Sequence, residues 1–471
     1  MKKIILSIGV AAIIAIVTIS SIKGEVISLN GEWQIAKTDG NLPKSYVAKI
    51  PVPGLVDLAI PALDAKGVFY QDSSWYWHKR TFELKDNAFD IIRLKIHKAK
   101  YWTKVYINGK YAGENLYCFT PSYFDIKPFL KPAGQPNEII IGVGTRTAMP
   151  FSIPDGHDYE KVRYFPGIYD NVEITLSDKP YINNIQCVPD IKNEKLRVVA
   201  EIEDNPSKAL KLSYVVSEVA TGRKVAATKI SPKVRIENGY AIVDFEIDMK
   251  GAKLWSPESP FLYKLTLSTD KDSRQVQFGM RSFRFDKEKK IALLNDEPYY
   301  IRGTNICIYR FFEDPDRNTL PWDRAWTVKL HERFKDMHWE MARYCIGFPP
   351  DYWYDVCDSL GFMIQDEYPI WCPLGGVELT YKAPAIAEEY RRWMRERWNH
   401  PSVVIWDAQN ETETLETGTA INMVRHLDLS DRPWENGWST PSSDKDVIES
   451  HPYLFMPYKE AGAKEPAEGY K

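Results

Sequence analysis

The chain has 471 residues, too many for one ordinary domain, and a length of this size predicts about three domains. Hydrophobic residues make up 44% and charged residues 27%, a composition typical of globular proteins and not of disordered chains. The net charge of −3 gives no general electrostatic reason to expect binding to nucleic acid or to an anionic membrane surface.

The N-terminus has the layout of a secretory signal. Lys2 and Lys3 precede an apolar run from Ile4 to about Ile19, and small residues follow. The run is somewhat short for a membrane span of about 20 residues, and an uncleaved anchor is the alternative. We therefore expect residues 1–24 to be a signal peptide outside the fold. The mature protein is expected to be periplasmic or secreted, without stable membrane insertion.

Residues 25–178 are expected to form β-strands with no long helix between them. The stretches "WYWHKRTFEL" (75–84), "DIIRLKIHKA" (90–99) and "NEIIIGVG" (137–144) are rich in β-branched and aromatic residues. Within "YWTKVYINGKYAGE" (101–114), Asn108-Gly109 is a strong hairpin signal because both residues tolerate positive φ. This pattern predicts a β-sandwich or jelly roll.

Residues 179–281 show a similar pattern on a smaller scale. The stretches "KLRVVAEIED" (195–204), "LKLSYVVSEV" (210–219), "YAIVDFEIDM" (240–249) and "FLYKLTLST" (261–269) alternate between apolar and polar residues. About 100 residues of such short strands predict one immunoglobulin-like β-sandwich.

From residue 282 to residue 471 apolar strands alternate with helical patterns. Such alternation predicts parallel strands with right-handed crossovers, hence a (β/α)8 TIM barrel. The predicted helices are 321–337, 350–361 and 384–398, and the predicted strands are 298–306, 339–345, 362–368 and 402–411. Residues 431–439 and 446–455 are weaker strand candidates. About six units result, whereas a complete barrel has eight, so we expect the barrel to be incomplete.

No cofactor or metal site is predicted. The six cysteines include no CxxC pair, and the eight histidines show no HExxH or other ligand spacing. Gly142 and Gly144 in "IGVGTR" lack the third glycine and the helix of a dinucleotide site. One disulfide is compatible with this cysteine content, but the sequence does not assign its partners.

Several sequence segments, in the same order along the chain, resemble those of glycoside hydrolase family 2, which includes β-galactosidases, β-glucuronidases and β-mannosidases. The words "VPGLVD", "WYWHKRTFEL", "INGKYAGENLYCFTPSYFDIKPFL" and "YFPGIYDNVEI" resemble the family's sugar-binding domain. The words "LWSPESPFLYKLTL" and "FGMRSFRFD" resemble the end of its immunoglobulin-like domain. The words "RGTNI", "ARYC", "CDSLGFMIQDE" and "NHPSVVIWDAQNE" resemble its first four barrel strands with their loops.

The resemblance implies a galactose-binding-like jelly roll for the first domain and a retaining exo-β-glycosidase that acts on terminal β-linked sugars. The N-terminal pattern adds export. Glu411 stands where the family has its general acid/base, and Asn410 stands where the family binds the sugar 2-hydroxyl. Both residues follow the apolar run 403–406, so they would emerge where barrel active sites lie. Asn-Glu occurs three times in the chain, and without this context Glu411 would be a loop carboxylate near Glu413.

Four further residues match the family pattern less specifically. Arg343 ends the second predicted barrel strand and would contact substrate or form a structural ion pair. Asp366 and Glu367 end the third, where a carboxylate would bind sugar hydroxyls or accept hydrogen bonds from Arg343. Tyr453 stands near the place of a family Tyr beside the nucleophile, and core packing is its alternative role. Trp434 and Trp438 would stack on a sugar ring or pack in the barrel. His400 would shape the turn before the strand or touch substrate.

The chain also departs from the family pattern. Ile346 stands where the family often has a His, and no strand that carries the family's nucleophile Glu follows Glu411. Glu435 and Glu449 are poor substitutes because both fall in what read as the fifth and sixth strands. We therefore expect the chain, as a C-terminally truncated enzyme, to hydrolyse no nitrophenyl β-glycoside on its own.

Two other functions remain open at this point. A non-catalytic carbohydrate-binding protein, or an inactive fragment, would retain the sandwich and part of the barrel. A structural cell-surface module would explain residues 26–280 but not the segments that resemble the family's barrel strands. The substrate is expected to be a carbohydrate, with galactose, glucuronic or galacturonic acid and mannose all open. Arg343 and Arg310 would suit an acidic sugar or serve structural roles. The sequence does not determine the oligomeric state.

Overall fold

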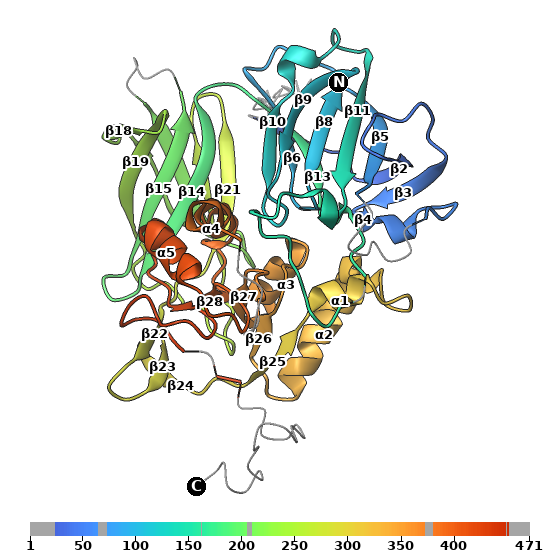
Figure 1. The fold of residues 1–471 in the computed structure, drawn as a ribbon. Helices are drawn as coiled ribbons and strands as arrows, with labels where there is room; N and C mark the ends of the chain where they lie inside the picture. Colours follow the sequence, from blue (N-terminus) through green and yellow to red (C-terminus); the bar gives the residue numbers. More distant parts are fainter. Residues whose placement is uncertain are drawn as a thin grey trace, which may run out of the picture.

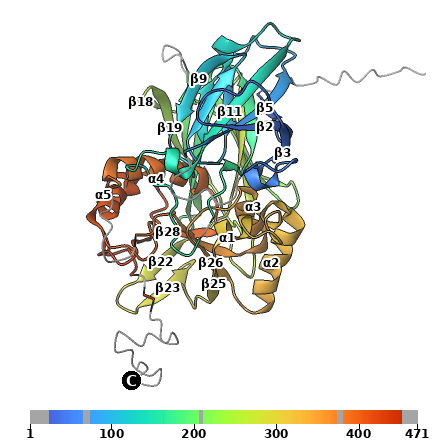
Figure 2. The same cartoon turned by 45° about the vertical axis from the view of Figure 1, so that its right-hand side comes forward.

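The structure is a computed structural model that describes residues 24–64, 73–161, 163–204, 210–372, 380–448 and 450–451. Two β-sandwiches stand side by side above a third body in which helices surround a parallel sheet (Figure 1). A turned view shows the first sandwich directly over this third body (Figure 2). The expected signal peptide lies outside the described residues except for Gly24.

The first sandwich combines a four-stranded sheet of order β1-β13-β6-β10 with a six-stranded sheet of order β3-β2-β5-β11-β8-β9. A third small sheet has the order β4-β12-β7. The strands are β1 (Glu25–Ser28), β2 (Gly31–Thr38), β3 (Ala48–Val52), β4 (Gly54–Leu55), β5 (Trp75–Glu83), β6 (Ile91–Ile96), β7 (Ala99–Lys100), β8 (Thr103–Ile107), β9 (Lys110–Asn115), β10 (Ser122–Asp125), β11 (Pro136–Gly144), β12 (Gly167–Ile168) and β13 (Val172–Ser177).

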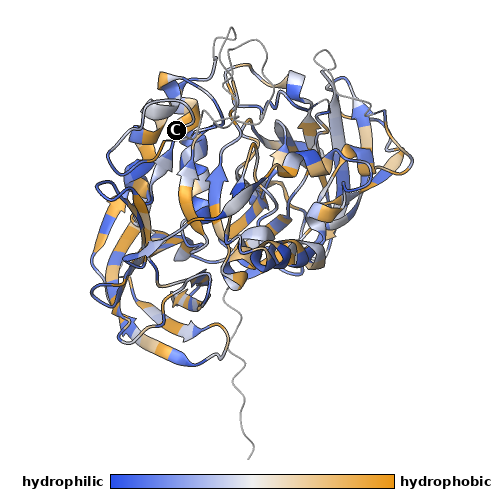
Figure 3. Ribbon diagram, turned by 90° about the horizontal axis from the view of Figure 1, so that it is seen from below, coloured by the Kyte–Doolittle hydropathy of each residue, from blue (hydrophilic) through white to orange (hydrophobic). Residues whose placement is uncertain are grey.

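The predicted hairpin at Asn108-Gly109 is confirmed. It joins β8 to β9, which pair antiparallel, and both turn residues have positive φ, 51° and 76°. Along the strands apolar and polar segments alternate, which the hydropathy colouring shows in Figure 3. Such alternation lets one side of each strand enter the sandwich core while the other side meets solvent or a neighbouring body.

The second sandwich packs sheet β14-β15-β19-β18 against sheet β17-β16-β20-β21. Its core is a separate apolar cluster that includes Val198, Val243 and Leu265, all fully buried. The strands are β14 (Tyr181–Asp190), β15 (Lys195–Glu203), β16 (Leu212–Glu218), β17 (Lys224–Ile230), β18 (Val234–Glu237), β19 (Tyr240–Asp248), β20 (Tyr263–Ser268) and β21 (Ser273–Phe278).

The third body contains a five-stranded parallel sheet of order β25-β26-β27-β28-β29 within the described residues. A small antiparallel sheet, β22-β23-β24, precedes it in the chain. The strands are β22 (Phe283–Asp286), β23 (Ile291–Leu294), β24 (Glu297–Tyr299), β25 (Gly303–Ile306), β26 (Met341–Tyr344), β27 (Met363–Glu367), β28 (Val403–Asp407) and β29 (Trp434–Glu435). Residues 446–448, expected to open a sixth strand, are not in one, and 452–455 lie outside the described residues.

Helices connect the parallel strands as the strand–helix alternation predicts. They are α1 (Ile308–Phe312), α2 (Arg324–Asp336), α3 (Tyr352–Leu360), α4 (Ala383–Arg397) and α5 (Leu415–Val424). Asp323 caps α2 by accepting hydrogen bonds from the Ala325 and Trp326 amides. Gly361, with φ of 68°, ends α3 in the left-handed conformation that glycine adopts without strain. Short 3-10 helices lie at 56–58, 127–129, 146–148, 320–322 and 425–427.

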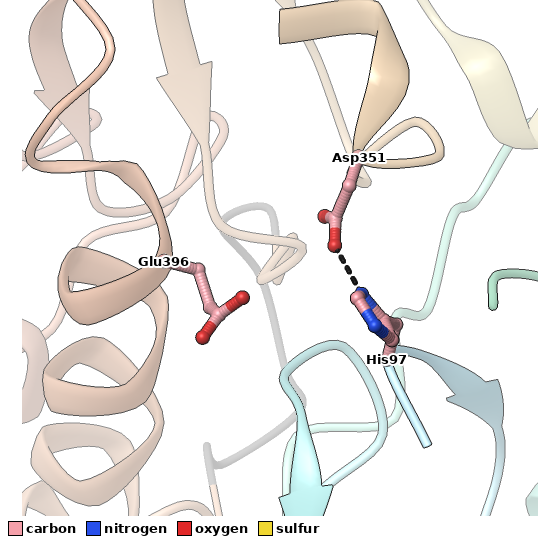
Figure 4. A group of neighbouring side chains, drawn as sticks. All are labelled: His97, Asp351 and Glu396. Carbon is pink, nitrogen blue, oxygen red and sulfur yellow. Dashed lines mark hydrogen bonds and ion pairs between the residues drawn. The ribbon is translucent and has the colours of Figure 1, made fainter. Parts of the chain in front are cut away.

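The first sandwich contacts the barrel through a shared apolar core and through charged side chains. One apolar cluster runs from the sandwich into the barrel, and the hydroxyls of Tyr169 and Tyr309 hydrogen bond across the boundary at 2.9 Å. Figure 4 shows the charged part of the boundary, where His97 points at Asp351 and Glu396 faces the same space. The His97 Nδ1 atom lies 2.6 Å from a carboxylate oxygen of Asp351.

The group formed by His97, Asp351 and Glu396 is compact enough to hold a metal ion. Its carboxylates, however, already face cations: Lys95 lies 3.1 Å from Glu396, and Lys98 and Arg397 pair with Asp351. These contacts identify the group as an interdomain ion network.

The structure bears on two further points from the sequence, a disulfide and a membrane span. All six cysteines are free thiols, so the disulfide that their number would allow is not formed. Among the helices in the described ranges, none is long and apolar enough to cross a membrane.

Candidate active site

Polar side chains gather at the carboxyl ends of β26, β27, β28 and β29. Arg343 is in register with Gln365, Glu367 with Asp407, and Asp407 with Glu435. Residues directly opposite one another on neighbouring strands present their side chains on the same face of the sheet. One face of the parallel sheet therefore carries a cation and four oxygen-bearing side chains at the edge where barrel active sites lie.

Arg343 connects this polar group. Its Nε atom donates to Asp407 Oδ2 at 2.8 Å, its Nη2 atom donates to Asn410 Oδ1 at 2.9 Å, and the same guanidinium forms a close ion pair with Glu367. The Arg343 side chain is 10% exposed, and both carboxylates are fully buried. A planar guanidinium with five N–H donors suits such a multiple contact, which fixes the side chain of Asn410.

Asp407 is an ionised carboxylate held by several donors. Burial acts to raise its pKa, but the charge of Arg343 and hydrogen bonds from Glu435, Arg343 and Gln365 outweigh burial, so the pKa lies below its ordinary value. The Gln365 amide donates at 2.7 Å.

Glu411 lies immediately after this network and is 5% exposed. Its backbone has φ of 39°, in a region that residues other than glycine rarely adopt. Such residues are found at functional sites. Its carboxylate forms a close hydrogen bond with Nδ1 of His451. The backbone before it is also fixed, because the Asn410 amide donates to the Ile370 carbonyl at 2.8 Å. Glu411 is therefore a held, buried carboxyl group.

The first sandwich contributes a wall beside this edge. Tyr159 packs edge-on against Trp371, with ring centroids 5.6 Å apart, and Trp371 forms a bridge with Asn410. The Tyr159 segment is fastened to the barrel by Asp158, which pairs with Arg310 at 3.1 Å. The Trp371 indole N–H is buried and has no hydrogen-bond partner among the described residues. Aromatic surface and an available N–H donor thus border Asn410 and Glu411.

The structure separates the two carboxylates that end the third strand. Glu367 faces Arg343 and accepts from the Ile346 amide. Asp366 lies on the opposite face, where Tyr354 and Trp393 each donate to it at 2.7 Å. Burial raises the pKa of Asp366 although Arg397 acts in the other direction. Asp366 therefore belongs to the packing between sheet and helices.

The remaining sequence candidates fall into two groups. Tyr453 and Glu449 lie outside the described residues. Trp434 is buried and packs against Trp393 and Trp406, and His400 pairs with Asp358 at 2.7 Å, so both serve packing in this structure. A second group with metal-compatible spacing, Asp355, Asp358 and His400, lies on α3 and the turn before β28, away from the carboxyl ends of the strands.

Sequence reasoning did not single out Asp407, Gln365 or His451. The strand pattern could have indicated Asp407 and Gln365. Asp407 lies two positions from Ile405, and Gln365 lies two positions from Glu367, so each shares a face of the sheet with that neighbour. His451 comes from a segment far along the chain, and nothing local relates it to Glu411. Only the tertiary structure brings the two together.

Two family patterns match the chain. "Glycosyl hydrolases family 2" matches residues 180–281, and "Glycosyl hydrolases family 2, TIM barrel domain" matches residues 287–456. Together they cover more than half of the chain.

Curated relatives carry glycosidase names. A putative beta-glucuronidase of Formosa agariphila is 24% identical over 394 residues, which are 81% of this chain and 36% of that protein. A beta-galactosidase of Thermoanaerobacter pseudethanolicus is 24% identical over 348 residues, 70% of this chain and 44% of that protein. The beta-galactosidase large subunit of Leuconostoc lactis is 24% identical and matched over 69% of its length. The chain thus spans less than half of the first two relatives.

Solved structures share the fold. A family 2 glycosyl hydrolase of Bacteroides cellulosilyticus superposes with a TM-score of 0.71 at 18% identity, over 88% of this chain and 56% of that one. A beta-glucuronidase of Bacteroides uniformis gives 0.68 at 23% identity, over 88% and 52%. The sandwiches and the TIM-barrel domain expected from the sequence are therefore confirmed. By its two family patterns, its fold and its relatives, this chain belongs to glycosyl hydrolase family 2.

Proposed function

We propose that this protein is a β-glycosidase in which Glu411 protonates the departing glycosidic oxygen and Asn410 binds the sugar 2-hydroxyl. The observation that supports the proposal most strongly is the fixed position of both residues at the carboxyl end of β28. Asn410 is held by Arg343 at 2.9 Å, and Glu411 is buried beside it. General acid catalysis needs a carboxyl group fixed within hydrogen-bond reach of the glycosidic oxygen, and the held position of Glu411 beside Asn410 supports that role.

His451 is the group that positions Glu411. Its Nδ1 and the Glu411 carboxylate share one hydrogen bond, which fixes the orientation of the carboxylate. In a retaining mechanism a second carboxylate, about 5–5.5 Å from the acid, attacks the anomeric carbon. Glu367 and Asp407 are held by Arg343 and are poor candidates for that attack.

Charge at the site bears on which sugar is bound. Arg343 is neutralised by Glu367 and Asp407, and Arg310 is neutralised by Asp158 and Glu160. Neither guanidinium supplies an uncompensated charge for a uronic acid carboxylate. We therefore propose a neutral terminal sugar such as galactose or mannose over glucuronic or galacturonic acid. From the N-terminal pattern we also propose that the protein is exported.

A second candidate function is sugar binding without hydrolysis. It is favoured by one observation: the buried carboxylates Glu367 and Asp407, beside Asn410, are both engaged by Arg343. A binding protein would keep Asn410 and its support but would not need a proton donor at Glu411.

Calorimetric titration with phenyl 1-thio-β-D-galactoside, -mannoside and -glucuronide tests the site, because thioglycosides resist hydrolysis. We expect Asn410→Ala to weaken binding of the preferred glycoside by roughly tenfold, the value of one hydrogen bond from a buried polar group. Asn422→Ala, on the exposed side of α5, is the matched control and should change nothing. Equal effects of the two substitutions would contradict the proposed sugar site.

Hydrolysis separates the two candidate functions. Nitrophenol release from the corresponding nitrophenyl β-glycosides that disappears in Glu411→Ala identifies an enzyme. Release that persists in Glu411→Ala would contradict the role proposed for Glu411. Absence of release does not by itself identify the non-catalytic alternative, because this chain is expected to hydrolyse no nitrophenyl β-glycoside on its own.

A further inference from the structure

A polar groove lies at the junction of all three bodies, away from the candidate active site. Its first half has a volume of about 350 Å³ and lies between β9, β10 and α4, and its second half of about 590 Å³ lies between β14, β19 and α4. The two halves share Asn183, Asn184, Tyr240, Arg391 and Arg395 and therefore form one continuous groove. Each half alone is in the size range of ligand pockets, about 300–1,000 Å³.

The course of α4 separates this groove from the carboxyl edge of the sheet. The helix connects β27 to β28, which run parallel, so it runs in the opposite direction to both. Its C-terminal turns, with Arg391, Arg395 and Glu396, lie toward the end of the barrel opposite Glu411. Figure 1 shows α4 beside the second sandwich, between it and the first. A molecule in the groove would not occupy the candidate active site.

Asn184 gives the groove a feature of a binding site. A bulge in β14 between Ile182 and Asn184 places Asn184 opposite Glu201, while Ile182 and Ile185 face the sandwich core. Asn184 is 8% exposed, lines both halves of the groove, and its Oδ1 has no hydrogen-bond partner in the described part of the chain. A buried acceptor without a partner is destabilising, and a hydroxyl bound in the groove would satisfy it.

The arginines of the groove are already neutralised. Arg395 makes a two-pronged contact with Glu201, one contact at 2.6 Å, and Arg93 pairs with Glu203 at 2.9 Å. Arg391 and Arg392 both pair with Glu388, each at 2.7 Å. A guanidinium has five N–H donors, so each keeps donors for a further acceptor. Arg391 and Arg392 share the one carboxylate of Glu388, and Glu114, which also lines the groove, supplies a second negative charge. This arrangement favours a neutral ligand over an anion.

The other lining groups suit sugar hydroxyls. Glu114 and Glu396 are acceptors, the Asn183 and Asn184 amides offer both donors and acceptors, and Tyr240 supplies an aromatic ring. Tyr123, 53% exposed, adds a second ring at the same groove. We propose that this groove is a second, non-catalytic binding site for a neutral oligosaccharide. The site would hold a glycan on the flank of the barrel, whether or not Glu411 is catalytic.

Titration with β-1,4-galactotetraose as the neutral probe and a heparin tetrasaccharide as the anionic probe tests the proposal. We expect the neutral probe to bind with a Kd of about 0.1–1 mM in the Asn410→Ala background, where the candidate active site is impaired. Asn184→Ala should weaken this binding at least about fivefold. Tyr240→Ala is the second variant if Asn184→Ala fails to fold. Asn193→Ala, in the exposed turn after β14, is the matched control.

Three results would overturn the proposal. Absence of neutral-probe binding up to about 20 mM would identify the groove as a hydrated seam between domains. Tighter binding of the anionic probe would refute the assignment to a neutral ligand. Binding that survives both groove substitutions would place the tetrasaccharide elsewhere. None of these results bears on Glu411, so failure here is distinct from failure of the proposed glycosidase function.

Discussion

The ion network between the first sandwich and the barrel should make the protein less stable in alkaline solution. Burial and the Lys95 ammonium both lower the pKa of His97, but hydrogen bonds and charge from Asp351 and Glu173 outweigh them and raise it to about 9 from its ordinary 6.5. His97 lies 2.6 Å from Asp351 and 3.1 Å from Glu173. The protonated imidazole is therefore the form that joins the two domains.

The sign and size of the effect follow from linkage. A group whose pKa is higher in the folded protein adds stability that is fully present below pH 6.5 and is lost as the pH rises through about 9. At about 1.36 kcal/mol for each pH unit, the whole contribution is roughly 3 kcal/mol. Nearby charges keep their state over this range. The pKa values of Lys95 and Arg397 are raised, and those of Asp351, Glu173 and Glu396 are lowered, by their mutual ion pairs.

Histidine proton NMR and denaturant unfolding measure this contribution. The His97 titration should have its midpoint near 9, and the wild type should lose about 3 kcal/mol more unfolding free energy than His97→Gln between pH 6.5 and 9.5. Glutamine can donate a hydrogen bond but cannot become charged. His338→Asn, at an exposed turn, should keep the wild-type slope. A His97 midpoint below 7, or equal slopes in wild type and His97→Gln, would refute the reasoning.

Three further predictions concern the barrel. Arg343→Lys should weaken glycoside binding roughly tenfold with the fold retained, because an ammonium cannot reproduce the planar fork of contacts; calorimetry that shows unchanged affinity would contradict this. Gly303→Ala should lower the thermal midpoint clearly, since a Cβ there would lie 2.1 Å from the Met341 carbonyl oxygen, and an unchanged midpoint would show that this strand pair relaxes. Asp428→Ala should cost about 3–5 kcal/mol in denaturant unfolding by leaving buried Arg432 without its carboxylate, and a loss below 1 kcal/mol would argue against that pair.

The parts of the fold that repeat a local pattern could be predicted from the sequence. The hairpin at Asn108-Gly109, the end of α3 at Gly361 and the apolar strand 403–406 depend on turn geometry and burial, which neighbouring residues determine. The α5 helix was not predicted, because its apolar and polar residues do not separate into two faces. Residues 446–448 were predicted as strand, but only the Val447 amide donates to β29, at the Trp434 carbonyl at 2.9 Å, and the three residues form no strand.

The residues of the candidate site were likewise predictable from the sequence only in part. Glu411, Asn410 and Arg343 were found from their position after strands and from a family resemblance. Gln365 and Asp407 require the register between strands, and His451 requires a contact across 40 positions of sequence. Sequence alone also placed Asp366 beside Glu367 without separating their faces, a distinction that the strand pleat makes.

The central claim is that Glu411 donates a proton to the glycosidic oxygen, and a pair of matched ligands tests it directly. A thioether sulfur is a much weaker hydrogen-bond acceptor than an ether oxygen, so the phenyl O-glycoside should bind about 2- to 10-fold more tightly than the phenyl thioglycoside. We predict that Glu411→Ala abolishes this preference and that Glu413→Ala, at the exposed neighbouring carboxylate, preserves it. An oxygen preference that persists in Glu411→Ala would contradict the account.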